Sequence, residues 1–134
     1  MPVQIITSAE AIALLGSDAI FLDVRSIPEF EAGHAPGAVN IPLMHMQGGG
    51  MTPNAAFPEE VAARLPKDRT VVVACKAGGR SARAAAMLLQ LGFERVLDHS
   101  GGWSGNATDP GWVRSGGPQT TQAEPEPGAG GGSP

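Results

Sequence analysis

Cysteine is nearly absent from this 134-residue chain, which contains a single one, Cys75. One cysteine cannot form a disulfide within the chain, so the class of small disulfide-stapled domains is excluded. Basic residues are few and unclustered, and the net charge is −4, which argues against a nucleic-acid partner. No long apolar run and no basic leader are present, so we expect no membrane span, no signal peptide and a cytoplasmic location.

Large apolar side chains are absent from residues 118–134, which contain four glycines and four prolines. Such a stretch cannot bury enough apolar surface to offset the entropy cost of ordering it, so we expect a disordered tail there. The remaining residues, 1–117, are enough for one domain with one core. Because the tail holds two glutamates and no base, the domain itself carries a net charge of −2.

Apolar runs and capping residues predict alternating strands and helices. The strands are expected at Val3–Ile6, Ala19–Val24, Ala38–Ile41, Thr70–Ala74 and Arg95–Leu97. The helices are expected at Thr7–Leu15, Ser26–Gly33, Pro58–Leu65 and Ser81–Leu91, the first two beginning at capping boxes. Residues 42–57, with three consecutive glycines, are expected to form a long loop, and residues 101–117 an irregular segment. This alternation predicts an α/β domain, a parallel sheet with helices on both faces.

The cysteine lies directly after the predicted strand Thr70–Ala74 and shortly before the predicted helix Ser81–Leu91. Ligands of parallel sheets bind beyond the carboxyl ends of the strands, so this is the expected place for a site. The start of the helix also offers unpaired N–H groups and a partial positive charge, both of which favour a sulfur anion.

The loop that follows the cysteine favours the same anion. Gly78 and Gly79 allow the backbone to curl so that successive amides point inward, and Lys76, Arg80 and Arg83 add full positive charges. A thiolate is the nucleophilic form of cysteine, whereas a buried structural cysteine needs none of these features. We therefore interpret the cysteine as a reactive nucleophile.

The spacing from Cys75 to Arg80 is C-x4-R. Cysteine phosphatases use a loop one residue longer, C-x5-R, which encircles a tetrahedral phosphate. A tighter loop leaves less room, and this suits a single sulfur atom attached to the cysteine.

Three sets of segments resemble the rhodanese family of sulfurtransferases. They are Asp23-Val24-Arg25 with Glu29-Phe30 and Gly33–Pro42, then Cys75–Ser81, and finally Gly101-Gly102-Trp103 with Trp112. They look like the family's first signature, its active-site loop and its C-terminal signature. The resemblance extends from about Val3 to Gly117, so it implies a single rhodanese-like domain over residues 1–117 with a five-stranded, mainly parallel sheet.

The resemblance also implies a reaction, in which Cys75 takes sulfur from a small anionic donor such as thiosulfate, or from a protein persulfide. A thiol or cyanide, or a protein thiol partner, then accepts the sulfur from the cysteine persulfide. The loop residues that would cradle the bound sulfur are Lys76, Ala77, Gly78, Gly79, Arg80 and Ser81. Neither a metal nor an organic cofactor is implied.

Four further residues are expected near the site in supporting roles. Asp23 and Arg25 follow a strand and could tune the site, but such residues more often pair with each other or with Glu29 and hold a loop in place. His34, in a turn, is expected to make a structural hydrogen bond rather than to act as a base. Arg80 is expected to lean over the loop; the alternative is a pair with Asp23 or Glu29.

Three classes of function stay open at this point. The first is a sulfurtransferase, and the second is a non-enzymatic sulfur carrier or binding module for a dedicated protein partner. The third is a cysteine phosphatase or arsenate reductase on the same fold. The C-x4-R spacing argues against the phosphatase, and the lack of a second cysteine argues against an internal dithiol reductase.

Overall fold

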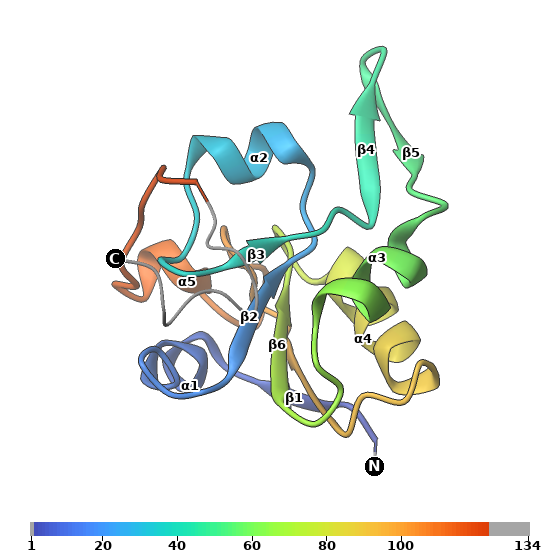
Figure 1. The fold of residues 1–134 in the computed structure, drawn as a ribbon. Coiled ribbons are helices and arrows are strands. Elements are labelled where there is room, and N and C mark those ends of the chain that lie inside the picture. Colours follow the sequence, from blue (N-terminus) through green and yellow to red (C-terminus); the bar gives the residue numbers. More distant parts are fainter. Residues whose placement is uncertain (1, 124–134) are drawn as a thin grey trace.

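A five-stranded parallel sheet forms the middle of the domain (Figure 1). The computed structural model describes residues 2–123. The strands are β1 (Gln4–Ile6), β2 (Ile20–Asp23), β3 (Val39–Asn40), β6 (Thr70–Ala74) and β7 (Arg95–His99), in the order β1-β7-β6-β2-β3. All four neighbouring pairs are parallel, so the expected α/β fold is confirmed and the sheet is parallel throughout.

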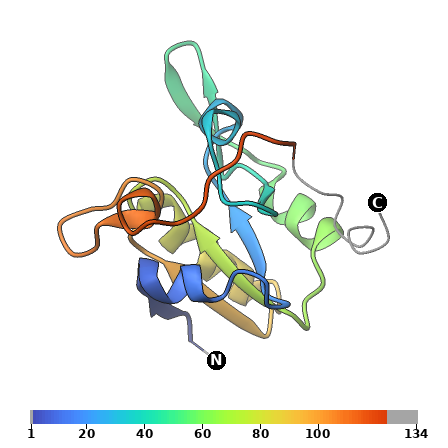
Figure 2. The ribbon, with the colours of Figure 1, turned by 90° about the vertical axis from the view of Figure 1, so that its left-hand side faces the viewer.

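Helices cover both faces of the sheet, as expected. They are α1 (Ser8–Ala13), α2 (Ile27–Ala32), α3 (Phe57–Arg64), α4 (Gly79–Gln90) and α5 (Gly111–Arg114). Figure 1 shows α3 and α4 on one side of the sheet and α1 and α5 on the other, while α2 lies beyond the carboxyl end of β2. Figure 2, turned by 90°, shows the same layers from the side of α1 and α5.

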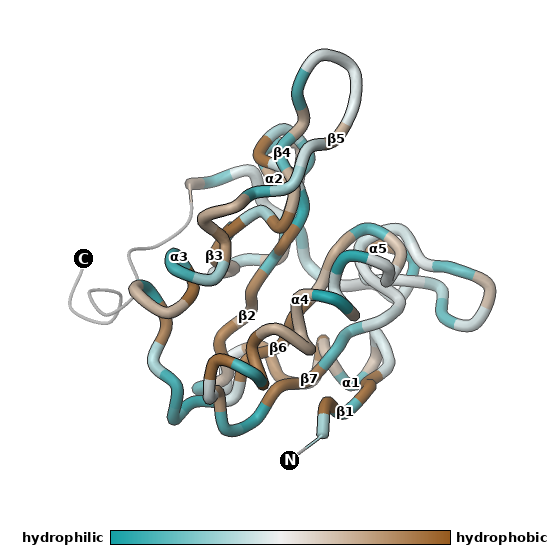
Figure 3. The backbone as a smooth tube through the Cα atoms, turned by 90° about the vertical axis from the view of Figure 1, so that its right-hand side faces the viewer, coloured by the Kyte–Doolittle hydropathy of each residue, from teal (hydrophilic) through white to brown (hydrophobic). Residues whose placement is uncertain are grey.

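The central strand β6 explains why both faces are covered. Val71 and Val73 join the core under α3 and α4, while Val72 joins the core under α1 and α5. All three are buried, which is why this strand is a continuous apolar run without alternation. In Figure 3, β2 and β6 are accordingly hydrophobic, while the tip of the hairpin above them is not.

The helices lie close to the ranges that capping residues and apolar runs predicted. The capping box between Thr7 and Glu10 is formed at the start of α1, and the box between Ser26 and Glu29 at the start of α2. Helix α4 begins at Gly79, two residues earlier than expected. It packs on the sheet through small and aliphatic side chains, among them Ala84, Ala85 and Leu88.

The loop expected at residues 42–57 is wrong, because it contains a β-hairpin. Strands β4 (Met44–Gln47) and β5 (Gly50–Pro53) pair antiparallel, with Met46 opposite Met51, and project from the domain (Figure 1). The turn is formed by Gly48 (φ 56°) and Gly49 (φ 83°). Two positive φ angles match the right-handed twist of a hairpin, so these glycines form a turn rather than a flexible loop.

The disordered tail expected from residue 118 is also wrong for its first six residues. Trp112 Nε1 donates a hydrogen bond to Pro118 O at 2.7 Å. His34 and Thr120 exchange two backbone hydrogen bonds, each of 2.9 Å. The packed part of the chain therefore continues beyond Gly117, and the rest of the expected tail, residues 124–134, lies outside the described residues. Within residues 2–123, no helix is long and apolar enough to cross a membrane.

Candidate active site

The central strand places Cys75 where it was expected, at the carboxyl end of β6 and four residues before α4. Its side chain is almost fully enclosed, with 2% of the residue exposed. Sγ accepts hydrogen bonds from Gly78 N at 3.1 Å and from Ser81 N at 3.3 Å. Two backbone donors at the start of a helix of twelve residues favour an anion on sulfur. Within residues 2–123, these are the two hydrogen bonds found to Sγ, and Ser81 is the last loop residue that donates to the sulfur.

Only one of the two loop glycines is required by the geometry. Gly78 has a φ of 113°, and a Cβ on it would lie 2.5 Å from the carbonyl oxygen of Ser100. Gly79 has an ordinary φ, and a Cβ there would meet open space. The close turn that directs the Gly78 amide at Sγ therefore depends on Gly78 alone.

A second segment, residues 99–106, is hydrogen-bonded to the loop that begins at Cys75. Trp103 N donates to the carbonyl of Cys75 at 2.8 Å, and Ser104 N donates to that of Lys76 at 2.9 Å. The Asn106 side chain donates to the carbonyl of Ala77 at 3.0 Å. The conformation of the loop is thus fixed by backbone and side-chain contacts from a segment some 30 residues away in sequence.

Sequence reasoning missed two residues of this site. One is Asn106, which lies in the irregular segment between β7 and α5 and carries no sequence signal. The other is Asp98, on β7, whose Oδ1 lies 2.7 Å from Ser81 Oγ. A lone acid inside an apolar strand, in Val96-Leu97-Asp98, was the signal that could have pointed to it.

Arg80 does not lean over the loop, because it is held by Glu29. Arg80 Nη1 and Nη2 donate to the two carboxylate oxygens of Glu29 at 2.7 and 3.0 Å. The hydrogen bonds from Arg80 lower the pKa of Glu29 to about 2; burial opposes them, and bonds from Ser26 add to them. The same bonds raise the pKa of Arg80. The alternative expected from sequence, a pair with Glu29, is the observed one, and it joins the starts of α2 and α4.

The remaining supporting residues also hold loops in place. Arg25 donates to both oxygens of Asp23 and to the carbonyl of Gly33, and its guanidinium carbon lies 4.8 Å from the centre of the Trp103 ring. His34 is buried, with Nδ1 at 2.7 Å from the carbonyl of Phe30. Asp23 and Arg25 thus pair with each other and His34 makes a hydrogen bond, while the supporting role of these residues in the site stays a prediction.

A model of the rhodanese-like domain family matches residues 7–108. The chain belongs to the rhodanese-like family. It is 40% identical over 96 residues to thiosulfate sulfurtransferase 16 of Arabidopsis thaliana, a match that covers 72% of this chain and 75% of that protein. It is 35% identical over 123 residues to thiosulfate sulfurtransferase 18 of the same plant, covering 90% and 85%.

Solved structures agree with this fold. The rhodanese-like domain superimposes on the crystal structure of Rv0390 from M. tuberculosis with a TM-score of 0.77, over 91% of this chain and all of the other, at 24% identity. The chain spans about half the length of several other curated relatives that it matches.

The cations that remain available to a substrate are exposed ones. Lys76, next to the nucleophile, is exposed, and so is Arg83 on α4.

On the other face of the sheet, an apolar cavity of about 30 Å³ touches Cys75 and is lined by Phe21, Trp103 and Trp112 among others.

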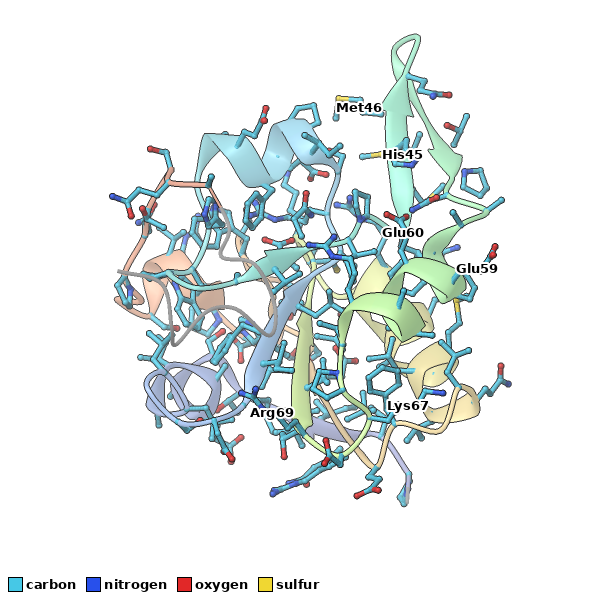
Figure 4. The ribbon with its side chains drawn as sticks, viewed as in Figure 1. His45, Met46, Glu59, Glu60, Lys67 and Arg69 are labelled. Carbon is cyan, nitrogen blue, oxygen red and sulfur yellow. The ribbon has the colours of Figure 1, made fainter. Side chains whose placement is uncertain are left out.

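The Met44-His45-Met46 sequence, whose thioether and imidazole groups are of the kind that bind soft metal ions, lies on the hairpin rather than beside Cys75. Figure 4 shows His45 and Met46 on β4, in the part of the rhodanese-like domain that projects outward. Within residues 2–123, no group of three or more histidine, cysteine, aspartate or glutamate side chains could hold a metal ion.

Proposed function

We propose that this rhodanese-like domain is a sulfurtransferase that carries a sulfane sulfur as a persulfide on Cys75. The observation that carries the proposal is the position of Sγ, which accepts hydrogen bonds from Gly78 N and Ser81 N at the start of α4. Fixed donors of this kind stabilise a sulfur anion without rearrangement during the reaction. The relatives named thiosulfate sulfurtransferases support the same class of reaction.

The reaction follows from the chemistry of a thiolate in this position. The Cys75 thiolate attacks the outer sulfur of a donor such as thiosulfate, and a new S–S bond forms. The S–S bond of the donor breaks, and sulfite departs with the electron pair. An acceptor such as cyanide or a thiolate then attacks the outer sulfur of the persulfide, and the Cys75 thiolate leaves unchanged. This is a two-step scheme with a covalent intermediate.

The charges around the site favour a small anionic donor. Lys76 is exposed beside the cysteine, whereas Arg80 is neutralised by Glu29. The two exposed cations, Lys76 and Arg83, together with the start of α4 provide moderate attraction for an anion, such as a small donor or the thiolate of a protein partner. Phosphate esters are poor candidates, because the loop is one residue shorter than the phosphatase loop and its arginine is engaged by Glu29.

Intact-protein mass spectrometry tests the proposal directly. Incubation with thiosulfate should add the mass of one sulfur atom, and later addition of cyanide should remove it and release thiocyanate. The Cys75→Ser variant should fold normally, gain no sulfur and show no transfer, because the chain has no other thiol. Wild-type turnover by Cys75→Ser would refute the covalent mechanism.

The same experiment separates an enzyme from a carrier. A dedicated sulfur carrier would gain and lose one sulfur but would show little turnover with thiosulfate and cyanide. Efficient hydrolysis of an aryl phosphate by the unmodified protein would instead favour a phosphatase and contradict the loop-length argument.

A further inference from the structure

Asp98 is a buried carboxyl group that the proposed reaction does not use. It is the fourth residue of β7, and its neighbour in register on β6 is Val73, whose side chain faces α4. Only 3% of Asp98 is exposed. The side chain reaches the first turn of α4, where its Oδ1 lies 2.7 Å from Ser81 Oγ. The contact therefore joins the sheet to the residue whose amide donates to Cys75 Sγ.

The proton count at Ser81 bears on the charge of Asp98. Ser81 Oγ lies 2.7 Å from Asp98 Oδ1 and 3.1 Å from the carbonyl oxygen of Gly78, but a hydroxyl group has one proton. An uncharged Asp98 can donate its own proton to Ser81 Oγ, which leaves the Ser81 proton for Gly78. An ionised Asp98 must accept the Ser81 proton, and the contact with Gly78 is lost.

The surroundings of Asp98 also oppose a charge. An ionised carboxylate in a protein interior needs several donors or a cation, and within residues 2–123 the Ser81 hydroxyl is the one donor found for this carboxyl. The neighbouring strands turn Val73 and Cys75 on β6, and Ile5 on β1, toward the same face. Cys75 is the one of these groups that can carry a charge in any form, and that charge would be a second negative one, so none of them can offset a carboxylate. Burial raises the pKa of Asp98, against the opposing effect of the hydrogen bond with Ser81.

We propose that Asp98 is a positioning residue for sulfur transfer, which in its uncharged form holds Ser81 and thereby keeps the Gly78 and Ser81 amides directed at Cys75 Sγ. Asp98 does not touch the reacting sulfur and acts through Ser81. The activity part of this proposal rests on the function proposed above, whereas the thiolate reactivity of Cys75 can be measured without any sulfur transfer.

The test compares Asp98→Asn with Asp98→Ala at several pH values. Asparagine stays uncharged and can donate to Ser81 Oγ, so this variant should keep at least a third of the wild-type rate of Cys75 alkylation by iodoacetamide at neutral pH. Alanine cannot hold Ser81, and the alkylation rate and kcat/KM for thiosulfate should both fall by about 3- to 10-fold, the equivalent of one lost hydrogen bond. As the pH rises and Asp98 ionises in the wild type, the value for Asp98→Asn divided by the value for the wild type should increase, both for the alkylation rate and for kcat/KM.

Asp109→Asn is the matched control. Asp109 is also buried and is also bonded to a serine at the start of a helix, Ser8 on α1. Its backbone is bonded to Asn106, but within residues 2–123 no hydrogen bond joins its side chain to the Cys75–Ser81 loop. This variant should lower the melting temperature and leave the pH dependence of alkylation as in wild type. If Asp98→Ala does not fold, the pH dependence of the alkylation rate of Asp98→Asn relative to wild type still tests the proposal.

Two results would overturn the proposal. One is a ratio of Asp98→Asn to wild type that stays constant with pH, and the other is an Asp98→Asn alkylation rate as low as that of an alanine variant that folds. Absence of sulfur transfer in the wild type, with the expected alkylation pattern intact, would contradict the proposed function and leave the role of Asp98 supported.

Discussion

Replacing Arg80 by alanine should weaken the fold more than it weakens the binding of anionic donors. Arg80 binds Glu29 through two parallel hydrogen bonds, and the two side chains are only 15% and 18% exposed. Removal of Arg80 leaves the Glu29 carboxylate half-buried, and Ser26 is then the one donor left to it within residues 2–123. The link between the starts of α2 and α4, close to the Cys75 loop, is lost at the same time.

The magnitude follows from the pKa of Glu29. Its fall from 4.5 to about 2 corresponds to a ceiling of about 3 kcal/mol. Ser26 supplies part of this, and solvent at the edge of the pair screens the charges, so we expect about 1–2 kcal/mol from the pair itself. Because the folded pKa lies below the unfolded one, this stabilisation is present above pH 4.5 and is lost as the pH falls toward 2.

Urea unfolding of a double-mutant cycle provides the assay. Arg80→Ala, Glu29→Gln and the double variant should show a coupling energy of about 1–2 kcal/mol at pH 7. The stability of Arg80→Ala should also depend less on pH between 4.5 and 2 than that of wild type. kcat/KM should fall by a similar factor for thiosulfate and for an uncharged sulfur donor, because the loop is loosened for both.

A different outcome would assign Arg80 to the substrate. If Arg80→Ala raised KM for thiosulfate alone and left the free energy of unfolding unchanged, the ion pair with Glu29 would not be its main role. The side chain would then have to leave Glu29 to meet the donor.

Two further predictions concern the backbone. Gly78→Ala should destabilise the domain by about 1–3 kcal/mol and slow sulfur transfer, because the added Cβ collides with Ser100 and the φ angle is positive. Gly79→Ala should be neutral or stabilising. Urea unfolding of both variants is the check, and equal changes in their free energies of unfolding would contradict the strain argument. Truncation after Gly117 should lower the melting temperature by several degrees, because the Trp112 indole loses its acceptor, while truncation after residue 123 keeps these contacts and serves as the control; equal melting temperatures would show that residues 118–123 contribute nothing.

Local signals sufficed for most of the elements. The capping boxes of Thr7 and Ser26 each involve a glutamate three residues away, and the apolar run Val71–Val73 marks a strand buried on both faces. The hairpin was not predicted from the sequence, because a run of glycines is compatible with both a flexible loop and a tight turn. Only the apposition of β4 and β5 selects the positive φ angles of Gly48 and Gly49.

The sequence by itself determined the nucleophile and its setting, since a single cysteine, the strand before it and the helix after it are all contiguous in the chain. The tertiary structure decided which groups surround them. Glu29 and Arg80 are 51 residues apart, and Ser81 and Asp98 are 17 apart on different elements. Which of several acids meets a given arginine or serine depends on the order and register of the strands. That order follows from packing the whole core, and no local pattern encodes it.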